Sequence, residues 1–204
     1  DTDVRARGGY VDHAPEDRIR RLITAGLALP GAVTDLPVEV QVFGSRPPGG
    51  GPNVLLAVAV DGSKVGLMLT PDGERRVSLD LHSVALEGTR LIDEAHEQLM
   101  ARSTDDGRFV SADNNPLIPT LVGYLAYQHE WTLGPGSYTF NVAVVDNVTG
   151  RIGAASIDIE IPPYADENEW GVSDPLLVTI DEAGRIHPVV LGRFLRGENV
   201  IAFV

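Results

Sequence analysis

The stretch "GPGSYTFNVAVVDNVTGRIGAASIDIEIP", residues 134–162, decides the fold class. Its apolar residues alternate with polar ones on both sides of "DNVTGR" (146–151), which holds the Asp, Asn and Gly typical of a tight turn. Period-two alternation predicts a β-hairpin with one buried face, and it leaves Asp158 and Glu160 on the solvent face. The side chains expected in the core are those of Phe140, Val142, Val144, Ile157, Ile159 and Ile161.

A lone hairpin is marginally stable, so this one needs partner strands and a second sheet. The same alternation occurs in "LPVEVQVFG" (36–44) and in "TLVGYLAYQHEWTL" (120–133), while "NVLLAVAV" (53–60) is a continuous apolar run typical of a central strand. Residues 64–86 predict a strand, a Pro-Asp-Gly turn and another strand. Together these segments predict a mainly β fold, an antiparallel immunoglobulin-like β-sandwich with two short helices.

The first helix is expected in "HAPEDRIRRLITAG" (13–26). Pro15 suits the first helical turn, Gly26 can end the helix, and Ile19, Leu22 and Ile23 lie on one face.

The second helix is expected in "GTRLIDEAHEQLMARS" (88–103), with Thr89 as its N-cap. Leu91, Ile92, Ala95 and Leu99 would then form one apolar stripe. The segment that follows, residues 104–119, is expected to be a long irregular loop.

Three parts follow from these patterns. Residues 1–33 are expected to be a strand and helix that link the chain to a preceding domain, and residues 34–163 the β-sandwich. Residues 164–204 are expected to be a β-rich tail that either completes the sheet or begins another module. Because the chain begins at Asp1 with neither Met nor signal peptide, we expect it to be an excised or processed piece.

Composition limits the partners. The net charge of −13 disfavours nucleic acid and anionic membranes, and no apolar run reaches the roughly 18 residues of a membrane-spanning helix. The chain has no cysteine, which excludes disulfides, thiolate metal ligands and thiol nucleophiles. We therefore expect a protein partner, without nucleic-acid binding or membrane insertion.

The best metal candidate is the 105–115 segment, whose oxygen ligands could suit calcium. It lacks EF-hand spacing, so a solvated loop is the favoured interpretation. His96-Glu97 begins a zinc-binding His-Glu-x-x-His motif, but position 100 is Met. We predict no metal and no cofactor. The possible calcium ligands are Asp105, Asp106, Asp113, Asn114 and Asn115.

Catalytic motifs are not found either. The chain has neither a Gly-x-Ser-x-Gly elbow nor a phosphate-binding Gly-x-x-x-x-Gly-Lys motif, so we predict no catalytic residues. His129 lies on the apolar face of its strand and is expected to be half-buried and hydrogen-bonded. The sequon at Asn147 is explained by turn chemistry, and Trp170 is either an exposed contact or a residue that packs the linker onto the sandwich.

Three stretches, "VRARGGY" (4–10), "TDLPVEVQVFG" (34–44) and "LGPGSYTFNVAVVDNVTGRIGAASIDIEIP" (133–162), resemble the region after the A-domain in bacterial von Willebrand factor A-domain-related (VWFA-related) proteins. The tail "VSDPLLV" (172–178) resembles the segment that follows, while 64–120 matches only loosely. The resemblance implies an exported protein, at the cell surface, in the periplasm or outside the cell. The Asp-x-Ser-x-Ser metal motif of the A-domain does not occur in this chain.

Three functions are consistent with these observations. The favoured one is a non-catalytic β-sandwich interaction or support module of an exported VWFA-related protein, active in adhesion or scaffolding. The alternative is a small-ligand module of carbohydrate-binding type, which requires exposed aromatic residues in a row, although only 6% of the residues are aromatic. An enzyme is the least favoured, because no nucleophile, base and oxyanion-binding set can be assembled.

Overall fold

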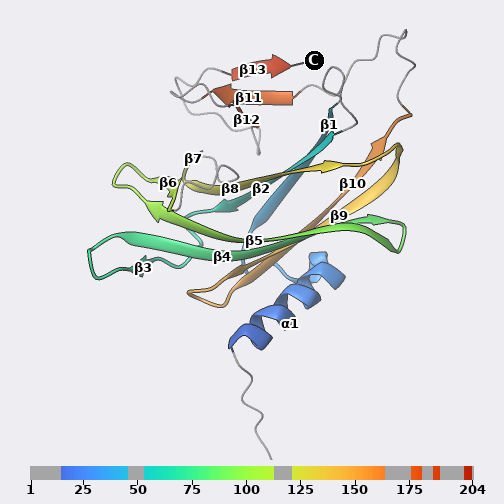
Figure 1. Cartoon of the computed structure of the whole chain (residues 1–204). Helices are drawn as coiled ribbons and strands as arrows, with labels where there is room; N and C mark the ends of the chain where they lie inside the picture. Colours follow the sequence, from blue (N-terminus) through green and yellow to red (C-terminus); the bar gives the residue numbers. More distant parts are fainter. Residues whose placement is uncertain are drawn as a thin grey trace, which may run out of the picture.

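The computed structural model describes residues 15–45, 53–112, 121–163, 176–180, 186–188 and 200–203. These residues form antiparallel β-sheets and one α-helix (Figure 1). The mainly β, antiparallel prediction is confirmed, whereas the immunoglobulin-like sandwich stays a proposal.

The helices are α1 (Pro15–Ala28) and a short 3-10 helix, η1 (Pro30–Ala32). The strands are β1 (Val38–Ser45), β2 (Asn53–Asp61), β3 (Met68–Leu69), β4 (Arg75–Glu87), β5 (Arg90–Ser103), β6 (Arg108–Ser111), β7 (Leu121–Val122), β8 (Tyr124–Thr132), β9 (Gly136–Asp146), β10 (Ile152–Ile161), β11 (Leu176–Ile180), β12 (Ile186–Pro188) and β13 (Val200–Phe203).

The strands form three sheets. Sheet A has the order β10-β9-β4-β5-β6-β7, with β3 paired to the start of β4, and sheet B has the order β1-β2-β8. In the tail, β12-β11-β13 form a sheet of their own. Among the described residues these tail strands pair only with one another. The predicted domain boundaries stay a prediction.

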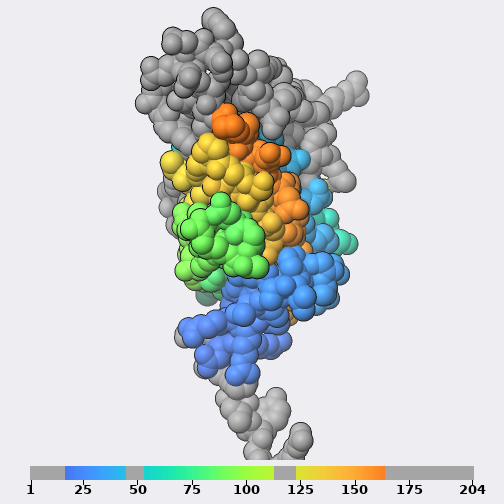
Figure 2. Space-filling view, turned by 90° about the vertical axis from the view of Figure 1, so that its right-hand side faces the viewer, coloured from blue at the N-terminus to red at the C-terminus, as the bar shows by residue number. Residues whose placement is uncertain are grey.

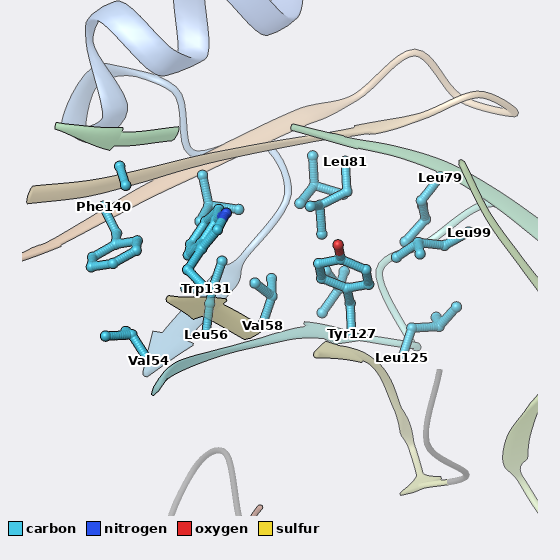
Figure 3. Packing of buried hydrophobic residues seen from close by; sticks show 14 of the residues in the cluster. Val54, Leu56, Val58, Leu79, Leu81, Leu99, Leu125, Tyr127, Trp131 and Phe140 are labelled. Atoms are coloured by element: carbon cyan, nitrogen blue, oxygen red, sulfur yellow. The ribbon is translucent and has the colours of Figure 1, made fainter. Parts of the chain in front are cut away.

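Sheets A and B share one apolar core. Tyr127 and Trp131 of sheet B point toward sheet A, where Trp131 meets Phe140 at a ring-centroid distance of 5.0 Å (Figure 3). The predicted core face of the β9–β10 hairpin is confirmed. Four of its six side chains are buried, and Ile157 and Ile159 are partly buried against the same cluster. Each large apolar side chain buried here contributes about 1.5–3 kcal/mol.

The predicted first helix is confirmed as α1, which runs two residues past Gly26. It lies on the outer face of sheet A, where Ile23 packs with Ala143, Val145 and Ile152 (Figure 1). A Cβ at Gly26 would be only 3.0 Å from the Cβ of Ala143, so glycine allows this close approach of helix to sheet. The half of the β9–β10 hairpin near its turn is thus covered on both faces, while Asp158 and Glu160 in the other half stay exposed.

Two of the places where sheet A meets sheet B lie at opposite edges of sheet A. After η1, Thr34 bridges Gly153, and the backbone N–H of Leu36 donates to the carbonyl of Ile152 at 3.0 Å before the chain enters β1. On the other side, β7 of sheet A continues into β8 of sheet B through Gly123, whose φ of +76° favours glycine. These two connections tie the sheets together around the core.

The predicted second helix is wrong. Residues 90–103 form β5, which pairs with β4 across the two-residue turn Gly88-Thr89. Gly88 has φ +59°, as such turns require. The turn lies on the molecular surface above α1 (Figure 2).

A β-bulge explains why the sequence pattern imitated a helix. Leu86 pairs with Leu91 and Ala85 with Asp93, so Ile92 is an extra residue on β5. The extra residue allows Ile92, Ala95 and Leu99 to contact the same core, although they are spaced by three and four residues. That spacing is the helical signature.

The predicted irregular loop at 104–119 is also partly wrong, because β6 lies within it and pairs with both β5 and β7. Residues 113–120 lie outside the described residues.

Candidate functional site

The turn between β9 and β10 is organised by a buried carboxylate. Asp146 is fully buried and accepts four hydrogen bonds, from the backbone N–H groups of Gly66, Val148 and Thr149 and from the Thr149 hydroxyl. The shortest are from Thr149 Oγ1 at 2.6 Å and from Gly66 N at 2.7 Å. These bonds compensate for burying the charge.

The bond to Gly66 fixes a second segment of the chain. Arg151 adds a contact of its own, because its Nη1 donates to the carbonyl of Lys64 at 3.3 Å. Val148 packs so closely on Gly66 that a Cβ there would lie 2.7 Å from the Val148 Cβ. The 64–66 segment and the β9–β10 turn therefore form one rigid unit.

Four exposed apolar side chains lie in this unit or next to it in the chain, Leu67, Met68, Leu69 and Val148, which we call the apolar platform. Leu69 shares a strand face with Arg75, and Met68 shares the other face with Arg76. Leu69 is the most exposed, at 70%. Three consecutive exposed apolar side chains, close to Val148, make this region a candidate interaction site. The platform was not predicted from the sequence, because "GLML" (66–69) fits a buried strand equally well.

The rim of the platform is basic. Met68 pairs with Arg76 and Leu69 with Arg75 on β4. Lys64 and Arg151 belong to the unit formed by the 64–66 segment and the β9–β10 turn. Arg76 is bound to Glu74 at 2.7 Å, whereas neither Lys64 nor Arg75 forms an ion pair with another described residue. Hydrogen bonding and charge from Glu74 raise the pKa of Arg76, which therefore stays charged.

A second candidate lies on the outer face of sheet A, where His82 of β4 stands directly opposite His96 of β5. Their rings are stacked with centroids 3.8 Å apart, and His96 Nε2 is 3.7 Å from Asp80 Oδ1. Burial lowers the pKa of His82, the charge of His96 lowers it further, and Asp80 and Glu94 act in the opposite direction. This pairing was not predicted, because it depends on the Gly88-Thr89 turn, where the sequence pattern indicated the start of a helix.

A third group lies inside the core. As predicted, His129 is half-buried and hydrogen-bonded, with its Nδ1 3.1 Å from the Tyr127 hydroxyl. Burial and the charge of Glu97 raise the pKa of Tyr127, so the phenol stays protonated. Ser83 Oγ and Trp131 Nε1 are buried without a hydrogen-bond partner in the described part of the chain. Ser83 thus has no base within hydrogen-bond reach there.

The loop candidate for calcium is only partly visible. Asp106 accepts a hydrogen bond from the Thr104 hydroxyl and pairs with Arg108 at 3.0 Å. The Thr104 bond lowers the pKa of Asp106. Asp113, Asn114 and Asn115 lie outside the described residues, so the predicted ligand set stays a prediction.

Two further residues named in the sequence analysis are Asn147 and Trp170. Asn147 of the sequon lies in the β9–β10 turn, as predicted, and its side-chain amide donates to Ser78 Oγ of β4 at 3.0 Å, a long-range contact that turn chemistry did not predict. Trp170 lies outside the described residues. Within the described ranges, no three His, Cys, Asp or Glu side chains are placed to hold a metal ion. No helix in these ranges has the length and hydropathy needed to cross a bilayer.

The arrangement is best suited to binding at the apolar platform, whose rigid support and exposed leucines distinguish it from the histidine pair and the interior group. Comparison with known proteins assigns no family, since no family model, curated protein or solved structure matches the chain.

Proposed function

We propose that this chain is a non-catalytic β-sandwich module that supports protein–protein interaction in an exported VWFA-related protein. The observation that carries the proposal is the apolar platform, which the buried Asp146 holds in place. Sheets A and B share one core, which supports a frame of the sandwich kind. Ordering a flexible loop weakens association, so a fixed platform favours binding.

Among the residues whose side chains the structure describes, no Phe, Tyr or Trp is exposed, so the carbohydrate-binding alternative gains no support from them. Tyr127, Trp131, Tyr138 and Phe140 are all buried in the core that sheets A and B share. A sugar-binding row needs exposed rings on one sheet face. An interaction module therefore stays the favoured function.

The experiment compares two immobilised forms of the chain, native and Leu69→Ser with Val148→Ser. Each is incubated with exported proteins from the source cells, and retained proteins are identified by mass spectrometry. We expect a partner that the native chain retains and the double variant loses. The control variant is Leu91→Ser, which changes a leucine exposed to 52% at the far end of sheet A and should retain the partner. Equal retention by all three forms would contradict the proposal.

A further inference from the structure

We propose that the apolar platform binds an acidic, extended segment of a partner protein that carries apolar side chains. This inference rests on the proposed function and names the chemistry of its partner. It is carried by the charge around the platform, by the open strand beside it and by the rigidity of its support.

The charge of the rim differs from that of the chain. The whole chain has a net charge of −13. Around the platform, however, four cations (Lys64, Arg75, Arg76 and Arg151) lie with three solvent-accessible carboxylates (Asp61, Asp72 and Glu74), and a fourth carboxylate, Asp146, is buried beneath them. Complementary charge guides encounter and selects the partner, so the rim favours an anionic segment.

The far end of sheet A has the opposite character. The surface near the β4–β5 turn and the second half of β10 carries Glu87, Asp93, Glu94, Asp158 and Glu160. Leu91 is exposed there among these carboxylates. Leu91 is exposed like Leu69 but is surrounded by carboxylates, which repel an acidic segment. This end of sheet A therefore provides a matched control.

The shape of the site favours an extended segment. Among the described strands β3 pairs only with β4, so no described strand occupies its second edge. A segment added there would form backbone hydrogen bonds with β3 and place alternate side chains on the platform. Because Asp146 already orders Gly66 and Val148, little conformational entropy is lost on binding.

An anionic membrane is the less favoured occupant. Polybasic membrane-binding segments use clusters of about 4–8 Lys and Arg. Negative charge in the surrounding chain weakens their contact with an anionic membrane. Here Asp72 and Glu74 interrupt the rim, and the overall charge of −13 repels an anionic bilayer. A short acidic segment meets the rim without bringing the rest of the chain to a negative surface.

The test uses the whole chain labelled with ¹⁵N and two synthetic peptides of one length, alternating Glu-Val and alternating Lys-Val. We expect the Glu-Val peptide to shift amide resonances of residues 64–76 and 147–151, with affinity falling as salt rises from about 50 to about 500 mM. Leu69→Ser and Arg75→Glu should each weaken binding about tenfold or more. Leu91→Ser should leave it unchanged.

Several results would overturn the inference. They are equal binding of the Lys-Val peptide, shifts elsewhere in the chain, and no shift at millimolar Glu-Val peptide. Platform-dependent binding to phosphatidylserine vesicles instead would identify a membrane as the occupant. Self-association that Leu69→Ser abolishes would identify a second copy. If only the peptide arm fails while the partner capture depends on Leu69, the proposed function stands and the acidic chemistry is wrong.

Discussion

The two long hairpins of sheet A, β9–β10 and β4–β5, share one core but differ on their outer faces. Over β9–β10 the helix α1 covers Ala143, Val145 and Ile152, so side chains are buried on both faces of the hairpin near its turn. Over β4–β5 the outer face keeps Asp80, His82, Glu94 and His96 at least partly exposed. A hairpin covered on both faces is a fixed frame, whereas one covered on a single face can carry titratable groups.

The turns of the hairpins differ in the same way. The β9–β10 turn is held by Asp146 and pins the platform segment. The β4–β5 turn contains only Gly88 and Thr89, and its Glu87–Arg90 ion pair lies on the surface. Exposed ion pairs contribute little to stability, so the first turn should resist change and the second should tolerate it.

The largest effect is expected from Phe140→Ala in β9. Phe140 is fully buried against Trp131, so its removal should lower the free energy of unfolding by about 3–5 kcal/mol. Urea unfolding of the variant measures this. Thr139→Ala, one residue away on the opposite face, is the control and should cost much less. A silent Phe140→Ala would mean that the hairpin does not face sheet B.

Asp146→Ala should come next, at about 3 kcal/mol, because it leaves buried N–H groups such as that of Gly66 without an acceptor. The matched control is Asp158→Ala on the exposed edge of β10, where we expect about 0.5 kcal/mol or less. Urea melts of both variants decide the matter. If the two carboxylates prove equal, Asp146 does not fix the turn, and the rigidity argued for the platform is lost.

Gly153→Ala should destabilise by about 1–3 kcal/mol, since a Cβ there would lie 1.8 Å from the carbonyl oxygen of Leu36. The chain would have to move the 33–36 segment off the edge of β10. Gly44→Ala in β1 has no atom within 4 Å of the new Cβ and is the control. Thermal melts of the pair test whether this segment ties the sheets together. Equal melting temperatures would show that it does not.

These contrasts explain which parts of the fold were predictable. The β9–β10 hairpin kept a strict period of two and a turn rich in Asp, Asn and Gly, so strands, turn and core face all followed from sequence. The β4–β5 hairpin was missed because Ile92 bulges, which converts a strand face into a spacing of three and four. Local pattern carries no information about an extra residue until the partner strand is known.

The candidate site depended even more on long-range pairing. Gly66 and Asp146 are 80 residues apart in sequence, and only the fold brings them to 2.7 Å. His82 and His96 likewise become neighbours through strand register. The pairing of β9 with β4 ends at Leu79 of β4. Beyond that point β3 pairs with β4 instead, and Leu67 to Leu69 are exposed there. Residue types alone predicted none of these placements.

The smallest expected effect is a pH dependence at the outer face of β4–β5, which β9–β10 should lack. Burial and His96 hold the pKa of His82 below its usual value, although Asp80 and Glu94 oppose the shift. The unfolded chain then binds more protons between the two pKa values of His82, so stability rises with pH in that interval. This contribution is complete above the unfolded pKa of about 6.5, and it is lost as the pH falls from there through the lower folded pKa.

Urea melts at several pH values between about 5 and 8 should therefore show lower stability on the acid side for the native chain. His82→Gln should remove this slope. His96→Gln should reduce it, because the positive charge that disfavours protonation of His82 is gone. If His82→Gln keeps the full slope, another group causes it; if the native chain is more stable in acid, the carboxylates outweigh burial. In either case the β4–β5 hairpin would not be the pH-sensitive part of the molecule.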